Sequence, residues 1–200
     1  MVNYIIKKSG KFLPSKEMKK IAWIKDKKIY KEAEKNPIKF WGKLAREGLK
    51  WEKPWKKTYE EKPPYFYWFK GGKLNFCVNV LDRHLDNPNK TALIWVPEPT
   101  NEKTIKLTYK ELYDKVNRFA NVLKKLGVKK GDVVAIYLPM IPEVLIAMLA
   151  CTRIGAIHSV VFSAFSADAL KIRLLDGKTK ILIGADGYYR RGKKEDLKKK

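Results

Sequence analysis

The sequence has 200 residues, enough for one ordinary domain or for a domain with an appended segment. Its 45% hydrophobic residues, among them 6 Trp, 10 Tyr and 8 Phe, exclude a chain that is disordered throughout. The basic residues, 44 against 21 acidic ones, give a formal net charge of +23, and most of them are lysines spread along the chain. This diffuse excess favours a compositional habit over a nucleic-acid site, because net charge reports on solubility and association.

Two cysteines, Cys77 and Cys151, are too few and too far apart for a disulfide framework or a zinc site. We expect two reduced, mostly buried thiols, which fits a cytoplasmic protein. Residues 1–15 lack the apolar core of a signal peptide. The longest apolar run without charge, residues 154–167, is shorter than the roughly 18 residues of a transmembrane helix. The sequence therefore predicts a soluble chain with no membrane partner.

The first 73 residues are rich in lysine and in aromatic side chains. A weak apolar stripe predicts a helix over residues 17–35, and a clearer one predicts a short helix over residues 39–49. Large aromatic side chains then crowd residues 51–69. Because such side chains must find cover, they predict a layer wrapped onto a globular body. The alternative, a platform on which bases stack, needs a strand pattern that this segment lacks.

Regular patterns begin after Gly72. Apolar spacing predicts a helix over residues 75–84, and two strands over residues 92–96 and 104–107 are separated by a proline-rich turn.

The clearest predicted element begins at Thr108. Thr108 and Glu111 have the spacing of a capping box, in which side chain and backbone satisfy each other's first-turn groups. Apolar residues then recur every three or four positions and form one wide face. Gly127 is expected to end this helix in a left-handed conformation.

The remaining elements alternate between strand and helix, which implies parallel strands joined by right-handed crossovers. Fully apolar strands predict a sheet that is covered on both faces. The fold class is therefore α/β, a partial parallel sheet with flanking helices, preceded by an irregular helical, aromatic-rich segment. The predicted strands span residues 133–138, 159–162 and 180–184, the predicted helices span residues 142–154 and 167–175, and a solvated, frayed end is expected over residues 193–200.

Ligands of open parallel sheets bind beyond the carboxyl ends of the strands. After the second predicted strand, residues 163–166 form a small-residue loop whose backbone N–H groups, at the start of a helix, suit an anion. After the third strand, Arg190, Arg191 and Lys193 surround Gly192 beside two tyrosines. Guanidinium groups match phosphate geometry, and tyrosine rings offer a face for a planar ring. From these residues alone, a solvated basic loop is the simpler interpretation.

The residues alone assign no catalytic group and no metal ligand. No nucleophile–base pair stands out, and neither a glycine-rich dinucleotide loop, a Walker loop nor a zinc-protease motif is present. His84 and His158 are both expected to be structural.

Several segments resemble the AMP-forming acetyl-CoA synthetase (acetate–CoA ligase) family, within the adenylate-forming superfamily. Residues 107–112 (LTYKEL) and the strand from residue 133 resemble adenylate-forming enzymes in general. Narrower resemblance to the acetyl-CoA synthetase branch comes from residues 150–162 (ACTRIGAIHSVVF) and residues 165–170 (FSADAL). The N-terminal wrapping region of that branch is similar at residues 40–41 (FW), 63–64 (PP), 68–69 (WF), 71–75 (GGKLN) and 81–84 (LDRH).

The resemblance implies a two-step reaction: a carboxylate and ATP give an acyl-adenylate, and CoA then displaces AMP to give the thioester. The full-length family uses ATP with Mg and CoA as small-molecule substrates and cofactors. By resemblance, Arg190, Arg191, Gly192 and Lys193 would bind the phosphates at the nucleotide end of CoA. Phe165 and Ser166 would belong to another part of the CoA site.

The sequence also departs from the family pattern. Ser163 and Ala164 stand where the family usually has glycines, which puts close backbone approach to a ligand in doubt. The family's phosphate loop for ATP, its adenine contacts, its acyl pocket and its catalytic lysine have no counterpart in these 200 residues. We therefore expect no ligase activity from this chain alone: it is a truncated or frame-split product, or a second chain, encoded downstream, completes the enzyme.

Other interpretations stay open at this point. The acid is acetate or propionate, and the chain is alternatively a basic module for RNA or another polyanion, or a non-functional remnant. Under the favoured interpretation the chain divides into a basic extension (residues 1–35), the wrapping region (36–106), an incomplete α/β subdomain of the AMP-binding enzyme (107–192) and a charged tail (193–200).

Overall fold

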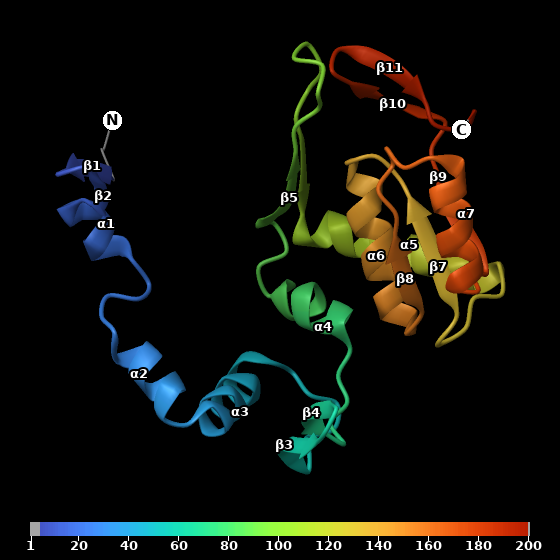
Figure 1. The fold of residues 1–200 in the computed structure, drawn as a ribbon. Coiled ribbons are helices and arrows are strands. Elements are labelled where there is room, and N and C mark those ends of the chain that lie inside the picture. The colour runs from blue at the N-terminus through green and yellow to red at the C-terminus, as the bar shows by residue number, and fades with distance from the viewer. Residues whose placement is uncertain (1–4, 200) are drawn as a thin grey trace. The chain divides into compact units, whose positions relative to one another are not determined.

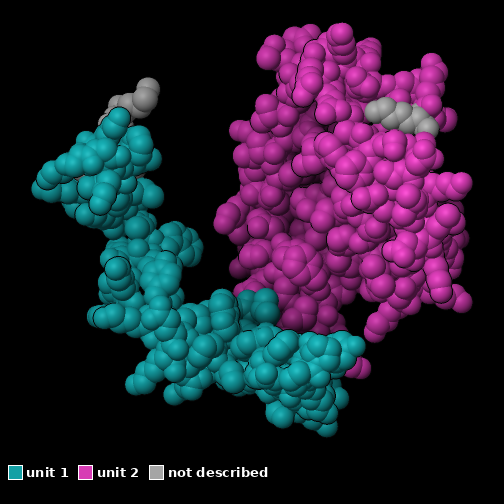
Figure 2. All heavy atoms as spheres, in the orientation of Figure 1, with its two compact units in different colours: residues 1–49, 53–72 teal, residues 50–52, 73–200 magenta. Residues whose placement is uncertain are grey.

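The computed structural model describes residues 5–199, and the predicted extension and tail therefore reach beyond it at residues 1–4 and 200. The chain forms two compact units, Met1–Leu49 with Lys53–Gly72 and Lys50–Glu52 with Lys73–Lys200 (Figures 1 and 2). The division into four segments that the sequence suggested stays a prediction. No helix in the described part of the chain has both the length and the apolarity needed to cross a membrane.

The first unit contains short elements with little core. The predicted helix over residues 17–35 is wrong in its middle, because the chain becomes extended at Ala22. Neither of the two helices found there buries a residue, so no packing holds a continuous helix together. The elements are β1 (Ile5–Lys8), β2 (Lys11–Pro14), α1 (Lys16–Ile21), α2 (Lys28–Lys35), α3 (Pro37–Gly48), β3 (Lys57–Lys62) and β4 (Tyr65–Lys70).

The crowded aromatic segment forms the antiparallel hairpin β3–β4, which the sequence analysis did not predict. Tyr59 and Trp68 face each other across the strands, with ring centroids 4.9 Å apart. Helix α3, which matches its predicted range closely, lies against β3: a Cβ added at Gly42 would lie 3.1 Å from the Thr58 methyl carbon. Cross-strand aromatic pairs therefore stabilise this hairpin, and its wrapping onto a larger body stays a prediction.

The second unit confirms the α/β class. Its central sheet has three parallel strands in the order β8–β7–β9, and two antiparallel hairpins accompany it. Helix α6 begins at Pro142 as predicted, and Gly155 ends it with a φ of 73°. The elements are α4 (Phe76–Val80), η1 (Asp82–His84), β5 (Thr91–Trp95), β6 (Ile105–Thr108), α5 (Tyr109–Lys125), β7 (Val133–Tyr137), α6 (Pro142–Ile154), β8 (Ile157–Val160), α7 (Ala167–Asp176), β9 (Ile181–Gly184), β10 (Gly187–Arg190) and β11 (Lys193–Asp196).

Both predicted ends of helix α5 are confirmed. The Thr108 hydroxyl accepts the Glu111 N–H, and the Glu111 carboxylate accepts the Thr108 N–H at 2.8 Å. The latter hydrogen bond lowers the pKa of Glu111 from its ordinary value. Gly127 has a φ of 82°, and the Val128 N–H donates a hydrogen bond to the carbonyl of Leu123.

The core lies mainly between the sheet and helices α5 and α6. Val134 and Ile136 of β7 face these helices, and Tyr137 faces α7 on the opposite side. Strand β7 is therefore covered on both faces, as predicted. Strand β8 is not the buried strand expected over residues 159–162: it begins two residues earlier, lies at the sheet edge, and leaves Ile157 and Val160 about half exposed.

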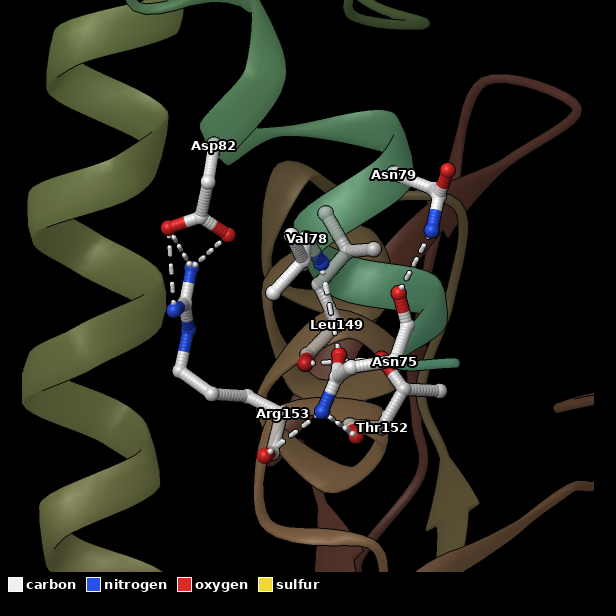
Figure 3. Close-up of polar contacts among 7 residues, drawn as sticks. All are labelled: Asn75, Val78, Asn79, Asp82, Leu149, Thr152 and Arg153. Atoms are coloured by element: carbon white, nitrogen blue, oxygen red, sulfur yellow. Dashed lines mark hydrogen bonds and ion pairs between the residues drawn. The ribbon is translucent and has the colours of Figure 1, made fainter. Parts of the chain in front are cut away.

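A polar cluster attaches the α4–η1 segment to the end of α6 (Figure 3). The Asn75 side chain caps α4 and donates to the carbonyls of Thr152 and Arg153 at 3.2 and 3.1 Å. The Arg153 guanidinium makes a bidentate pair with Asp82, with contacts of 3.0 to 3.1 Å. The helix predicted over residues 75–84 breaks at Leu81, which is fully buried, and this break directs Asp82 at Arg153.

The charged end of the chain is ordered as far as it is described. The predicted frayed end is wrong for residues 193–196, which form β11 and pair with β10. Leu197 is buried against Tyr137 and Val161, and its N–H donates to the carbonyl of Asp186 at 2.8 Å. The burial of Leu197 and the pairing of β11 with β10 therefore hold this end of the chain in place, although the lysines around them favour solvent.

Candidate functional site

A cavity of about 1050 Å³ lies at the carboxyl edge of the sheet in the second unit. Its walls come from the loop after β5, the turn before α6, the end of β8 and the β10–β11 hairpin, which lies beside the β5–β6 loop in Figure 1. Its apolar lining includes Trp95, whose indole N–H donates to the Met140 carbonyl at 2.7 Å. This is the edge at which open parallel sheets bind ligands.

The predicted basic residues lie at the tip of the β10–β11 hairpin. Arg190 and Lys193 pair across the strands, which leaves Arg191 and Gly192 as a two-residue turn. Both turn residues have positive φ, 52° and 75°, as in the turns that suit hairpin twist. For a non-glycine residue such as Arg191 this conformation costs about 1–2 kcal/mol, which the strand pairing must offset.

The four predicted phosphate-binding residues are thus brought together, but they do not share one surface. Arg190 is half-buried and lines the cavity, whereas Arg191, Gly192 and Lys193 are exposed at the tip and are not among the residues that line it. The cavity lining itself carries both signs of charge. Its cations are Arg190, Lys194 and Lys198, and its acidic residues are Glu98, Glu102, Asp186, Glu195 and Asp196.

Glu98 is a functional candidate that the sequence analysis missed. Its carboxylate oxygen Oε1 accepts the Gly192 N–H at 2.8 Å, although the two residues are 94 positions apart. Pro97 and Pro99 flank it, and the turn they form was predicted. The signal in the sequence was an acidic residue in a loop at the same sheet edge as the basic turn.

Phe165 and Ser166 lie in a loop that is firmly held. The Ser166 hydroxyl caps α7 by accepting the Ala169 N–H at 3.3 Å. The Tyr137 hydroxyl donates to the carbonyls of Ser163 and Phe165, at 3.0 and 2.7 Å. Of this region, Phe162 and Ser163 line the cavity that Arg190 lines, and Phe165 and Ser166 are not among its lining residues.

The two tyrosines of the hairpin have different surroundings. Tyr189 is partly exposed, with the Lys194 ammonium 5.5 Å from its ring centroid. Tyr188 packs against the small cluster around Val161, and its hydroxyl oxygen is buried with no hydrogen-bond partner among the described residues. Tyr189 is therefore the ring that remains free to meet a planar ligand.

His84 and the two cysteines take structural positions, while His158 lies half-buried in β8 and its expected structural role stays a prediction. The His84 ring lies 4.9 Å from the Tyr109 ring. Cys77 and Cys151 are buried and free, as expected, and burial raises the pKa of each thiol to about 11. Such thiols stay protonated near neutral pH and are poor nucleophiles.

Replacing Gly187 with alanine is expected to destabilise the hairpin that holds the basic turn. A Cβ at Gly187 would lie 2.6 Å from the Glu195 carbonyl oxygen, which is backbone and has to shift. Overpacking of this kind costs about 1–2 kcal/mol, measurable as a lower midpoint in urea denaturation. Gly184→Ala is the matched control, since its added Cβ would meet nothing within 4 Å. Equal effects of the two substitutions would contradict the close approach of β10 to β11.

The sequence matches two family models over adjoining ranges. Residues 81–200 match the AMP-binding enzyme family, and residues 26–80 match the acetyl-coenzyme A synthetase N-terminus. The second unit therefore lies mostly within the first match.

Relatives and a solved structure agree with these matches. An acetyl-coenzyme A synthetase of Gemmatimonas aurantiaca is 48% identical over 99% of this chain and 30% of its own length. An acetyl-coenzyme A synthetase of Leptospira biflexa is 52% identical over 93% of this chain and 29% of its own length. A 3-hydroxypropionyl-coenzyme A synthetase of Sulfurisphaera tokodaii is 49% identical over 86% and 26%.

The solved structure of acetoacetyl-CoA synthetase from Streptomyces lividans superposes with a TM-score of 0.77, at 28% identity, over 82% of this chain and 26% of that one. The chain thus spans about 30% of the length of its curated relatives. With a family match over 120 of its 200 residues, the chain belongs to the AMP-binding enzyme family and carries an acetyl-coenzyme A synthetase N-terminal region ahead of the matched part.

Proposed function

We propose that this chain is the N-terminal part of an AMP-forming ligase that joins a short-chain acid to CoA through an acyl-adenylate. The observation that carries the proposal is about 50% identity, over nearly the whole chain, to proteins named acetyl-coenzyme A synthetase. Acetate is the first candidate acid for that reason. A relative named for 3-hydroxypropionate is similarly identical, which keeps other short acids open.

The proposed role of this part is to bind and orient the nucleotide end of CoA. Arg190 at the cavity and Arg191 and Lys193 at the tip would pair with phosphate oxygens, and the exposed backbone at Gly192 permits close approach. Charge-assisted hydrogen bonds of this kind are roughly twice as strong as neutral ones. Phe165 and Ser166 stay weaker candidates, because their loop is already engaged in hydrogen bonds.

No catalytic role is proposed for a residue of this chain. In this family ATP, bound with Mg, would transfer its AMP group to the carboxylate, and pyrophosphate would leave. Among residues 5–199, no group of three or more His, Cys, Asp or Glu side chains suits a metal ion. The chain spans about 30% of the length of its relatives, and we propose that the ATP-binding and acyl-binding parts of the ligase lie outside these 200 residues.

The test is calorimetric titration of the 200-residue chain with CoA at low ionic strength. The double variant Arg190→Ala/Lys193→Ala is expected to weaken binding by at least about tenfold, because a single charge-assisted hydrogen bond contributes about 1.5–3 kcal/mol and each tenfold corresponds to about 1.4 kcal/mol. Arg118→Ala/Lys178→Ala, which removes the same charge from exposed positions away from the turn, is the control. Equal losses in both double variants, or no CoA binding by the folded natural chain, would overturn the proposed site.

A further inference from the structure

The amide at the tip of the basic turn already holds an anion. In a hairpin whose register pairs Arg190 with Lys193, the N–H of Gly192 takes no part in strand pairing. Outward-facing turn amides beside cations are typical donors to phosphate oxygens. In this chain that donor is taken up by the Glu98 carboxylate at 2.8 Å.

Glu98 is held in place by its own loop. Pro97 is buried and Pro99 is half-buried, and the Glu102 N–H closes a turn onto the Pro99 carbonyl at 3.0 Å. Two flanking prolines restrict the backbone before any ligand arrives. The carboxylate is therefore presented to the turn by a restrained loop.

The turn does not need Glu98 for its shape. Four strand pairs between β10 and β11, and the positive φ values of Arg191 and Gly192, define the hairpin by themselves. What Glu98 adds is a negative charge on the Gly192 N–H, inside the turn whose neighbours in sequence are Arg190, Arg191 and Lys193. Like charges at short range repel each other, and they compete for the same donor.

We infer that Glu98 is an internal competitor of the phosphate, a specificity-determining residue that lowers the affinity of the basic turn for phosphorylated ligands. This rests on the proposed function of the turn. A phosphate that binds at the turn therefore has to displace the Glu98 carboxylate from the Gly192 N–H.

The experiment compares Glu98→Gln with the natural chain in CoA titrations, because glutamine keeps an acceptor for the Gly192 N–H and removes the charge. The dissociation constant for CoA is expected to fall about three- to tenfold, and each tenfold corresponds to about 1.4 kcal/mol. The gain should shrink when salt is raised from about 0.05 to 0.5 M, since screening weakens exposed charges. Glu98→Ala, which also removes the acceptor, should bind CoA more tightly than the natural chain too.

Asp176→Asn is the matched control, since it removes one negative charge at the last residue of α7, away from the turn, and should leave CoA affinity unchanged. Thermal unfolding of each variant checks that the fold is intact. If Arg190→Ala/Lys193→Ala weakens CoA binding while Glu98→Gln leaves it unchanged or weakens it, the inference is wrong and the proposed function stands. If Arg190→Ala/Lys193→Ala has no effect, or the natural chain binds no CoA, the proposed site fails and the inference fails with it.

Discussion

Replacing Leu123 with alanine is expected to lower the free energy of unfolding by about 3 kcal/mol. Leu123 lies on the inner face of α5 and is only 1% exposed. It belongs to the main core cluster, together with residues of α4, α6 and β7. Truncating a buried leucine removes its transfer free energy and leaves a cavity, with typical losses of about 2–5 kcal/mol. Urea denaturation followed by tryptophan fluorescence measures the change.

Leu126→Ala is the control for this prediction. Leu126 is close by in sequence, at the C-cap of the same helix, but its side chain is 60% exposed. Truncating an exposed leucine removes few contacts, so we expect the free energy of unfolding to change by no more than about 0.5 kcal/mol. Similar losses at the two positions would mean that the inner face of α5 is not packed as the structure describes.

Local signals explain why the second unit could be predicted well from the sequence. The capping box at Thr108, the left-handed Gly127 and the first-turn Pro142 each act through neighbouring residues. Such signals are readable without knowing what packs against the helix. The three-strand parallel sheet followed from the alternation of these well-marked helices with apolar runs.

Pairing between distant residues explains what the sequence analysis missed. The run predicted as the second strand, residues 159–162 (SVVF), and the buried β7 (VVAIY) are both mostly apolar. That β8 lies at the edge of the sheet and β7 at its centre follows only from the strand order. The β10–β11 hairpin contains Arg191 at positive φ, where a glycine or asparagine would have signalled the turn. Because no turn was recognised, the sequence analysis predicted a frayed end at residues 193–196 from their charge alone.

The candidate site, too, could be predicted only where its residues are neighbours in the sequence. The cluster of Arg190, Arg191 and Lys193 could be found because the residues adjoin in sequence, and its binding role came from resemblance. Glu98 could not be found in this way, because its contact with Gly192 spans 94 residues. The pairing of β10 with β11 brings Gly192 to the Glu98 loop, and no local pattern encodes that approach.

Three segments that carried the family resemblance contain residues whose contacts the structure explains. Asn75 and Asp82 lie in the GGKLN and LDRH segments, and Arg153 lies in the ACTRIGAIHSVVF segment. In the structure these three residues meet and attach α4 and η1 to the end of α6. Their side chains have partners inside the second unit, so packing of the fold accounts for these residues of the resemblance.

Asp82→Ala is accordingly expected to destabilise the second unit by about 2 kcal/mol. The side chains of Arg153 and Asp82 are only 19% and 23% exposed, and the Arg153 Nε is buried with no hydrogen-bond partner among the described residues. Removing one partner of a buried pair costs about 3–5 kcal/mol, and we lower that figure because both side chains are partly exposed. Urea denaturation of the variant and the natural chain measures the difference.

The exposed pair between Lys110 and Asp114 supplies the contrast, since its side chains are 56% and 43% exposed. Asp114→Ala should change stability by no more than about 0.5 kcal/mol.

The penalty at Asp82 comes mainly from leaving the Arg153 charge uncompensated, and the guanidinium also packs 5.1 Å from the Tyr113 ring centroid. The double variant Asp82→Ala/Arg153→Ala should therefore be more stable than the sum of the two single losses predicts. Strict additivity would show that the two side chains contribute independently, against the bidentate geometry in Figure 3.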